Sequence, residues 1–467
     1  ESQYHIMKKH LLLWIAATAL CCSCTQKKET SQPLPFKDGE FKEWAQTPPM
    51  GWNSWDCYGA GVTEDELLGN AEFMRDRLKQ YGYQYVVCDI QWYEPAAKGN
   101  VYNNFADLCM DEYSRLIPAV NRFPSSANGA GFKPIADKIH SMGLKFGIHI
   151  MRGIPRQAVH RNTRIYGTTA RARDIASQFS LCPWNTDMYG VDTEKRGAEE
   201  YYDSLFKLYA SWGVDFVKVD DIANTEFSPQ NPYSAEKEIE MIRAAIDRSG
   251  RDMVLSLSPG PAPLNKAEHL SENANMWRIS GDFWDRWDKL LNMFSLCEKW
   301  YPYVKDGSFP DCDILPLGKL CIDGSYMGDM GRDSGFTKEE QKTMMTLWAV
   351  FRSPLFFGGE LRLTDNYTLS LVTNPEVINV NQNSEKPLFV YNKGGIAVWQ
   401  TKIENCTAVA VFNLSDEEKH YKLSFSDLGI ENVRAVRDLW ARKDIPKCEN
   451  DVAVSLKPHS SEFFEIY

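Results

Sequence analysis

The sequence lacks the motifs of several common functional classes. It has no Gly-rich phosphate loop, no HExxH helix, no Ser-His-Asp arrangement and no metal-ligand spacing, so we expect neither a metal ion nor a cofactor. The net charge is −11, with no concentration of positive residues. The chain therefore lacks the positive field that binding to nucleic acid or to an anionic lipid surface requires. An uncharged or small substrate fits this composition better.

Signals for cysteine pairing are missing as well. Beyond residue 24 there are nine cysteines, at positions 57, 88, 109, 182, 297, 312, 321, 406 and 448, with no regular spacing and no CxxC pair. Neither a disulfide framework nor a zinc site is indicated. We expect none of these cysteines to act as a nucleophile.

The N-terminal region has the pattern of an export signal. Met7-Lys8-Lys9-His10 precedes an apolar run at residues 11–20, which is too short for a permanent membrane-spanning helix. The small residue Ser23 before Cys24 resembles a bacterial lipobox, which predicts a lipid on Cys24; an ordinary cleaved signal peptide is the alternative. Residues 25–46, rich in Lys, Glu, Ser, Gln and Pro, are expected to form a solvated tether. We predict an exported, periplasmic or outer-membrane-anchored bacterial lipoprotein that touches the membrane only through its lipid. The sequence carries no signal for an oligomeric state.

The remaining chain is typical of a globular protein with an ample core, since 43% of residues are hydrophobic and 25% charged. Between residues 49 and 358, β-rich runs alternate with helical patterns. Eight repeated βα units predict a (β/α)8 TIM barrel over residues 47–384. The expected strands begin near Met50, Tyr85, Lys145, Val214, Met253, Met276, Asp311 and Phe351.

Local signals agree with this alternation. Capping boxes begin at Thr63 and Thr337, and the helical pattern that ends at Trp212 is followed by Gly213. From residue 385 onward, short alternating runs such as IAVWQTKI and CTAVAVFNL contain no long helix. These runs predict a small C-terminal antiparallel β-sandwich domain over residues 385–467.

Functional side chains of such a barrel lie at the carboxyl ends of its strands. Lys218 and Asp220 follow an apolar run and share one face of a strand, so the ammonium favours the ionised form of the carboxylate. A carboxylate held charged suits a nucleophile that attacks a sugar C1. The alternative is an ion pair that only plugs the barrel mouth. Asp221 should point toward the helices.

A second acid, Asp282, stands four residues after Arg278 in a Gly-containing loop beside Phe283 and Trp284. Partial desolvation by these aromatic rings would suit a proton donor, although a helix N-cap is an equally good interpretation of the spacing. One ionised and one protonated carboxyl facing the same bond is the arrangement that glycoside hydrolysis requires.

Aromatic and polar residues at other strand ends could bind the sugar. Trp55, Trp92 and Trp184 could stack on a sugar ring, although any tryptophan is more often a core residue. His149 is a hydrogen-bonding candidate, and a satisfied buried histidine is the alternative.

Five segments together resemble glycoside hydrolase family 27, the family of α-galactosidases and α-N-acetylgalactosaminidases. They cover residues 47–382 in the family's order and are PPMGWNSW at residues 48–55, KVD at 218–220, WR at 277–278 with Asp282, DCDIL at 311–315 and TNPEVINVNQ at 373–382. The resemblance implies a retaining mechanism. In this mechanism Asp220 attacks the anomeric carbon, and Asp282 protonates the leaving oxygen and then activates water. The resemblance also implies that Asp89, Lys218, Arg278 and Asp313 hold sugar hydroxyls and that Trp55 lines the ring.

Three departures from the family pattern bear on the substrate. Typical members have two acids that hold the 4- and 6-hydroxyls of galactose where this chain has Asp89-Ile90, ahead of Gln91-Trp92. His149 replaces a usual tyrosine. Ser258 stands where α-galactosidases have a glutamate, which resembles the N-acetylgalactosaminidases, but the flanking Pro259-Gly260-Pro261 differs from both patterns.

We therefore predict a retaining exo-glycosidase that hydrolyses terminal α-D-galactosyl or closely related residues. Catalysis is assigned to Asp220 and Asp282, and substrate binding to Trp55, Asp89, Trp92, His149, Lys218, Ser258, Arg278 and Asp313. The alternatives are an α-N-acetylgalactosaminidase, a β-L-arabinopyranosidase, for which Ile90 suits a sugar without a 6-hydroxyl, and a surface lipoprotein that only binds glycans.

Overall fold

The computed structural model describes residues 39–324, 330–446 and 448–467. The predicted signal at residues 1–24 and residues 25–38 of the predicted tether lie outside this part of the chain. Among the described residues, no helix combines the length and apolar character needed to cross a bilayer.

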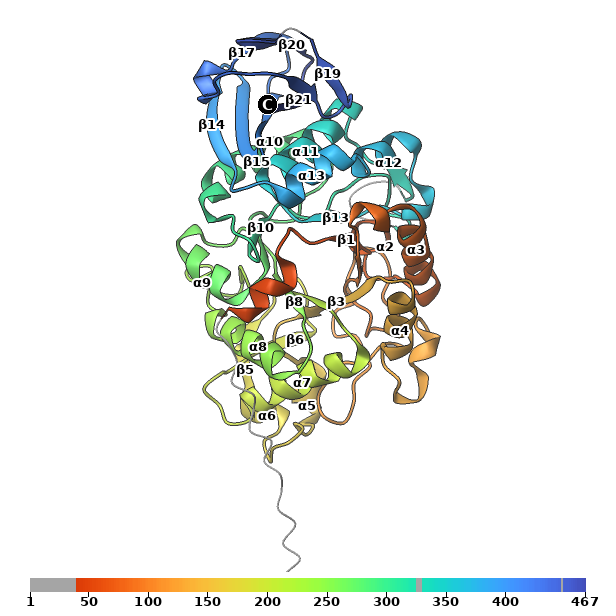
Figure 1. Ribbon diagram of the computed structural model, residues 1–467. Coiled ribbons are helices and arrows are strands. Elements are labelled where there is room, and N and C mark those ends of the chain that lie inside the picture. The colour runs from red at the N-terminus through yellow and green to blue at the C-terminus, as the bar shows by residue number, and fades with distance from the viewer. Residues whose placement is uncertain (1–38, 325–329, 447) are drawn as a thin grey trace, which may run out of the picture. The chain divides into compact units, whose positions relative to one another are not determined.

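Eight parallel strands form the predicted barrel (Figure 1). They run in the order β10-β9-β8-β7-β3-β2-β1-β13. A parallel bridge between Leu315 and Phe357 joins the two ends of this sheet: the Leu315 N–H donates to the Phe356 carbonyl at 2.7 Å, and the Gly358 N–H donates to the Leu315 carbonyl at 2.9 Å. The strands are β1 (Met50–Asn53), β2 (Tyr85–Cys88), β3 (Lys145–Met151), β7 (Phe216–Asp220), β8 (Val254–Leu257), β9 (Met276–Arg278), β10 (Phe309–Asp311) and β13 (Leu355–Phe357).

Six of the eight strands begin at their predicted starts or one to two residues after them, and the last two need correction. The run expected to begin at Asp311 ends there, because β10 covers Phe309–Asp311. The run expected from Phe351 is still helical at that residue. The helix stops at Arg352, which has a φ of 62°, and Pro354 cannot continue it, so β13 starts only at Leu355.

The helices confirm the capping signals. Thr63 precedes α3 and its N–H donates to Glu66 at 2.8 Å, while Thr337 and Glu340 form a reciprocal capping box at the start of α11. Gly213 ends α7 with a φ of 85°. The helices are α2 (Trp55–Tyr58), α3 (Glu64–Arg77), α4 (Lys133–Ser141), α5 (Arg156–Arg161), α6 (Ala172–Ile175), α7 (Ala198–Trp212), α8 (Glu236–Arg248), α9 (Ala267–Asn273), α10 (Trp287–Trp300), α11 (Lys338–Phe351), α12 (Asn366–Val372) and α13 (Pro375–Asn383).

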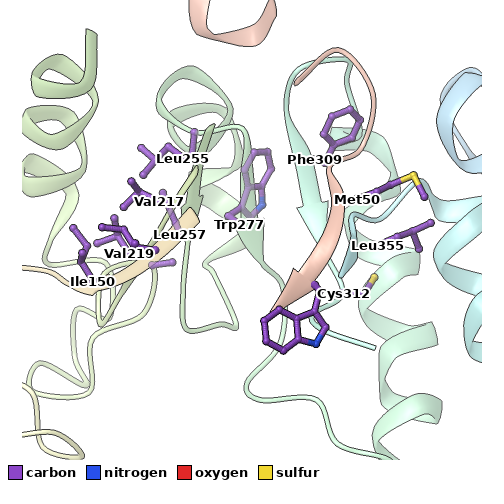
Figure 2. Close-up of a cluster of buried hydrophobic side chains, with 14 of the residues drawn as sticks. Met50, Ile150, Val217, Val219, Leu255, Leu257, Trp277, Phe309, Cys312 and Leu355 are labelled. Carbon is purple, nitrogen blue, oxygen red and sulfur yellow. The ribbon is translucent and has the colours of Figure 1, made fainter. Parts of the chain in front are cut away.

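The barrel interior is layered because strand side chains alternate between two faces. At the amino end the rings of Tyr85, Phe216 and Phe356 meet with centroid separations of 5.2–6.3 Å and fill the barrel. The next inward residue of β7 is Lys218 and the one after it is Asp220. Figure 2 shows the other face, where Val217 and Val219 of β7 lie beside neighbouring apolar side chains. The aromatic layer fills the amino end of the barrel, so Lys218 and Asp220 lie above it, toward the carboxyl ends of the strands.

The end of the predicted tether belongs to the folded body. Residues Glu40–Ala45 form a 3-10 helix, η1, and Phe41 and Ala45 are buried. The guanidinium of Arg243 lies 4.7 Å from the ring centroid of Phe41, and Asn275 donates to the Phe41 carbonyl at 3.0 Å. The prediction of a solvated tether is therefore wrong for these residues, because Phe41 packs against the guanidinium of Arg243 and its carbonyl accepts a hydrogen bond from Asn275.

Two smaller sheets extend the barrel's loops. After β3, the chain forms β4 (Ile154–Pro155), β5 (Ala176–Leu181) and β6 (Met188–Val191), which pair in the order β4-β6-β5. Further along, β11 (Lys319–Leu320) pairs with β12 (Arg332–Asp333).

The C-terminal residues form the predicted antiparallel sandwich, drawn in blue in Figure 1. A six-stranded sheet and a two-stranded sheet share a buried apolar cluster that includes Val398, Val409, Leu423 and Leu456. The six-stranded sheet runs in the order β14 (Leu388–Lys393), β15 (Ile396–Ile403), β16 (Cys406–Asn413), β21 (Ser461–Ile466), β18 (Val436–Asp438) and β19 (Lys443–Ile445), and the small sheet pairs β17 (Lys419–Ser424) with β20 (Asp451–Leu456).

Candidate active site

A cavity of about 450 Å³ opens at the carboxyl ends of the barrel strands. Seven of the ten predicted site residues line it: Trp55, Asp89, Lys218, Asp220, Arg278, Asp282 and Asp313. They come from the carboxyl ends of five different strands, as expected for a barrel active site. The other three, Trp92, His149 and Ser258, do not line the cavity.

Asp220 ends β7 with its side chain 16% exposed. One carboxylate oxygen meets His149 Nε2 at 3.0 Å, and the other accepts the Asp221 backbone N–H at 3.0 Å. Burial opposes ionisation, but the hydrogen bond and charge of His149, the ammonium of Lys218 and the Asp221 amide together lower the pKa of Asp220 below its usual value. Asp220 is therefore held as an anion that faces the cavity.

The direct partner of Lys218 is Asp89 and not Asp220. Lys218 Nζ donates to Asp89 Oδ2 at 3.0 Å, and the Asn53 amide donates to the same oxygen at 2.8 Å. Burial disfavours both charges, yet the carboxylates of Asp89 and Asp220 raise the pKa of Lys218 and its ammonium lowers the pKa of Asp89. As the sequence predicts, the charge of Lys218 favours the ionised form of Asp220. The side-chain hydrogen bond to Asp220 comes from His149 and not from Lys218.

Arg278 connects two further acids of the cavity. Its Nη2 lies 2.7 Å from Asp313 Oδ2 and 3.3 Å from Asp282 Oδ1, and it also donates to the Ser280 carbonyl. Asp313 is buried and accepts the Phe283 N–H at 2.8 Å. Burial raises the pKa of Asp313, and neighbouring carboxylates add to this effect against the guanidinium of Arg278. Arg278 thus holds the carboxylates of Asp282 and Asp313 in place on the same side of the cavity.

Asp282 is not desolvated as predicted. Its side chain is 53% exposed, although Phe283 and Trp284 are buried. The helix N-cap alternative is also wrong, because the residue before α10 is Arg286. Asp282 is instead a solvent-accessible carboxyl at the rim of the cavity, tethered by Arg278. Such a group can exchange protons with water while it faces a bound sugar.

Trp55 and Trp184 form an aromatic side of the cavity together with Tyr102. Tyr102 stacks on Trp55 with a centroid separation of 6.0 Å and an interplanar angle of 25°, and its ring lies 6.0 Å from that of Trp184. All three are partly exposed. This wall offers ring faces on which the apolar side of a sugar can rest.

The prediction that Trp92 stacks on sugar is wrong. Trp92 is fully buried, its indole N–H donates to the His149 carbonyl at 2.7 Å, and its ring meets those of Tyr93, Phe132 and Trp212 edge-on.

The predictions that His149 and Ser258 contact the substrate also need correction. His149 is fully buried and acts on the cavity only through Asp220. Ser258 is buried with its hydroxyl directed at the Val219 carbonyl, 3.4 Å away, so Pro259 and Gly260 form that wall.

Asp56 is the main lining residue that sequence reasoning missed. It follows Trp55 on α2 and is 3% exposed, and its Oδ2 has no hydrogen-bond partner in the described structure. Burial, reinforced by the charge of Asp313, raises the pKa of Asp56 well above its usual value. Its position next to Trp55 was the only available signal. Glu226 and Ile314 also line the cavity without a sequence signal.

One cluster outside the cavity has metal-ligating residue types. Glu236, Glu240 and His269 on α8 and α9 place ligand atoms within 4.8 Å of one another. Each carboxylate already has an ammonium partner, because Lys266 contacts Glu236 at 2.9 Å and Lys237 contacts Glu240 at 2.9 Å. The cluster is thus neutralised within the protein and carries no argument for a metal.

Comparison with known proteins places this geometry among sugar hydrolases. Two family models match the chain: one described as alpha galactosidase A, over residues 187–383, and one described as the alpha galactosidase C-terminal beta sandwich domain, over residues 393–466. Alpha-galactosidase 2 of Arabidopsis thaliana is 26% identical over 428 residues, which are 90% of this chain and 90% of the plant protein.

Two solved bacterial structures are more similar to this chain than the plant enzyme is. A family 27 β-L-arabinopyranosidase from Geobacillus stearothermophilus is 57% identical, covers 91% of this chain and 97% of its own, and superimposes with a TM-score of 0.89. A variant of that enzyme has been solved in complex with arabinose. A Bacillus halodurans protein, provisionally assigned as an α-N-acetylgalactosaminidase, is 52% identical, with coverage of 90% and 97% and a TM-score of 0.80.

Proposed function

Because the chain belongs to glycoside hydrolase family 27, we propose that it is a retaining exo-glycosidase whose preferred substrate is a terminal β-L-arabinopyranoside. A β-L-arabinopyranoside has the ring configuration of an α-D-galactoside but lacks the hydroxymethyl group. The proposal therefore keeps the galactoside-type site that the sequence predicts and changes only the substituent at C5 of the ring. The similarity to the Geobacillus enzyme supports it.

Ile90 is the observation that carries the proposal. It follows Asp89 at the end of β2, lines the cavity and is 2% exposed. Its backbone N–H donates to Asp89 Oδ1 at 3.0 Å, so the apolar side chain stands directly beside the carboxylate that binds Lys218 and Asn53. A sugar hydroxyl placed against Ile90 would lose its hydrogen bonds to water without gaining a partner. A pentopyranose has no 6-hydroxyl to lose.

The two catalytic roles follow from the environments of the two acids. Anionic Asp220 forms a bond from its carboxylate oxygen to the anomeric carbon, while the bond from that carbon to the leaving oxygen breaks. Asp282 gives its proton to the leaving oxygen. In the second step Asp282 takes a proton from water as the water oxygen displaces Asp220, which returns as a carboxylate. A retaining pair requires carboxyl groups about 5–5.5 Å apart.

The α-N-acetylgalactosaminidase alternative has weaker support. It relied on a small Ser258 leaving room for an acetamido group, but Ser258 does not line the cavity, and Pro259 and Gly260 stand there instead. The alternative of a glycan-binding protein without turnover does not explain why an ion-paired anion and a half-exposed acid face the same cavity.

A panel of p-nitrophenyl glycosides tests the proposal. We expect kcat/KM to be highest for the β-L-arabinopyranoside, lower for the α-D-galactoside, and negligible for the α-N-acetylgalactosaminide and the α-glucoside. Asp220→Asn should lose at least about a thousandfold in kcat, since the nucleophile is removed. NMR of the first-formed sugar should show the anomeric configuration of the substrate. A preference for the acetamido sugar, or turnover undiminished in Asp220→Asn, would contradict the proposal.

We also propose export with a lipid on Cys24, which the N-terminal pattern favours. In cells fed an alkyne-tagged fatty acid, the wild-type chain should be labelled and Cys24→Ser should not. Equal labelling of both chains would refute the assignment.

A further inference from the structure

A second cavity, of about 460 Å³, lies beside the candidate active site. One side is built by α5 and the β4-β6-β5 sheet that follow β3, and the other by the loop after β2 at residues 105–108. Gln157 holds the two sides together, because its side-chain amide accepts the Leu108 N–H at 2.9 Å and donates to the Leu108 carbonyl at 2.7 Å. The cavity is therefore a built feature of the fold.

Three arginines converge on this cavity: Arg156, Arg161 and Arg173. Within the described part of the chain, none of the three forms an ion pair. The guanidinium of Arg173 donates to the backbone carbonyls of Val159 and His160. The guanidinium of Arg156 donates to the Thr186 carbonyl at 3.2 Å and has a buried Nε without a partner. The chain has 63 acidic residues, so three arginines that line one cavity and form no ion pair are unusual.

The two acids of the cavity do not neutralise these arginines. Asp187 is buried, and its Oδ2 accepts hydrogen bonds from Gln91 at 2.6 Å and Tyr93 at 2.9 Å, on the barrel side. Asp107 is exposed at the mouth. The cavity thus retains an excess of positive charge in a protein whose net charge is −11.

Aromatic rings stand next to the free cations. The Arg156 guanidinium lies 4.5 Å from the ring centroid of Phe105 and 5.4 Å from that of Tyr189. The Phe105 side chain is exposed, at 74%. A guanidinium fork binds a planar carboxylate through two parallel hydrogen bonds, and an exposed ring offers a face to a sugar. Together they suit a sugar that carries a carboxylate.

The same two chain segments line both cavities. Tyr102 and Trp184 face the candidate active site, while Phe105 and Thr186 face the second cavity, and the Phe105 N–H donates to Thr186 Oγ1 at 3.1 Å. The two cavities therefore lie on opposite sides of a single wall. A substrate whose terminal sugar occupies the first cavity can extend across this wall into the second.

We propose that the second cavity binds the carboxylate of a hexuronate residue in the aglycone of the substrate, through Arg156, Arg161 and Arg173. This inference rests on the proposed glycosidase function and extends it from the terminal sugar to the glycan that carries it. The enzyme would then favour terminal sugars on an acidic glycan over the same sugars on a neutral one.

A matched pair of oligosaccharides tests the inference. Both carry the same terminal sugar and backbone; one has a glucuronate residue, and in the other that carboxyl group is reduced to a hydroxymethyl group. We expect wild-type kcat/KM to favour the acidic substrate by about tenfold or more at low salt, the gain typical of one charge-assisted hydrogen bond. The preference should shrink in 0.5 M NaCl because salt screens exposed charges.

Arginine variants locate the effect. Arg161→Gln, on an exposed side chain, and Arg156→Gln should each abolish most of the preference without changing turnover of p-nitrophenyl glycosides. Arg75→Gln, an exposed arginine on α3 that pairs with Asp76, is the matched control and should keep the preference. Equal wild-type kcat/KM for the two oligosaccharides, or a preference that survives both variants, overturns the inference.

A binding measurement separates this inference from the proposed function. Saturation-transfer NMR with methyl β-D-glucuronide and methyl β-D-glucoside needs no turnover, and only the glucuronide should bind, in a manner that depends on Arg161. Such binding without turnover of any glycoside would refute the enzyme assignment and leave the cavity assignment standing. A change in oligomeric mass in Arg161→Gln without any loss of glucuronide binding would instead identify an interface between copies and overturn the inference.

Discussion

Replacement of Ile90 by aspartate gives the sharpest test of sugar selection. The substitution restores the second acid that typical family members carry beside Asp89. A hydrogen bond from a sugar hydroxyl to a charged acceptor contributes about 1.5–3 kcal/mol, which is about a 10- to 150-fold change in relative kcat/KM. Repulsion from Asp89 and burial of a new charge oppose this gain. We therefore expect the ratio of α-galactoside to β-L-arabinopyranoside kcat/KM to rise by at least about tenfold, near the lower limit of that range.

Ile90→Ala separates space from hydrogen bonding. It opens the same wall without adding an acceptor, so α-galactoside turnover should improve less than in Ile90→Asp. The side chain is 2% exposed, and its truncation should lower the free energy of unfolding by about 2 kcal/mol or more. Both variants should therefore be assayed well below their unfolding midpoints, as measured by circular dichroism.

The measurement is kcat/KM for both p-nitrophenyl glycosides in the wild type and in each variant. If both variants are folded and the substrate ratio stays within about threefold of wild type, the hydroxymethyl group does not lie against Ile90 and the proposed sugar preference loses its structural basis. A rise in Ile90→Ala equal to that in Ile90→Asp would show that space alone governs the choice.

Three further predictions address the neighbouring side chains. His149→Phe removes the hydrogen bond to Asp220 and raises the pKa of Asp220 toward its usual value; since the nucleophile must be ionised, the ratio of variant to wild-type kcat/KM should fall as the pH drops from 7 to 4, and a pH-independent ratio would argue against this role. Trp92→Ala should cost about 3–5 kcal/mol of unfolding free energy in urea, whereas Trp55→Ala should mainly raise KM, and the reverse pattern would restore Trp92 as the sugar platform. Lys218→Met leaves buried Asp89 without its cation and should cost about 3–5 kcal/mol, which Asp89→Asn in the same chain should partly restore; a stable single variant would contradict the buried pair.

Local chemistry carried most of the fold prediction. The alternation of β-rich runs with helical patterns predicted eight strands, and capping residues such as Thr63 and Thr337 marked helix starts because their side-chain bonds form within four residues. The strands expected to begin at Asp311 and Phe351 were misplaced, because apolar sequence continues into the loop after β10 and through the end of α11. The buried η1 helix was missed because polar composition alone does not show that Phe41 will pack against Arg243, which lies more than 200 positions further along the chain.

The site was predictable where a side chain follows directly from its place in a strand. Lys218 and Asp220 lie on the same face of β7 because strand side chains alternate between two faces. Asp89 and Arg278 lie at the carboxyl ends of β2 and β9, so the sequence could also place them at the cavity. Whether each of these residues lines the cavity or is buried behind its wall was not predictable. Trp92, His149 and Ser258 stand at strand ends as well, but helix packing around Trp212 and the turn at Pro259 place them behind the wall. Whether such a residue faces the cavity depends on packing against residues far away in the sequence, which the local sequence pattern does not reveal.

The roles of the cavity acids follow from how five aspartates share two cations. Lys218 and Arg278 are the two cations of the lining, and they lie deepest against Asp89 and Asp313. Asp56 forms no ion pair with any residue that the structure describes, and burial raises its pKa against the more distant charge of Lys218, which favours a neutral carboxyl group. Asp220 is kept anionic chiefly by His149, and the ammonium of Lys218 and the backbone amide of Asp221 add to this effect. Asp282 alone is half-exposed. Since a general acid must regain a proton from solvent in each cycle and a nucleophile must not hold one, these two environments are not interchangeable.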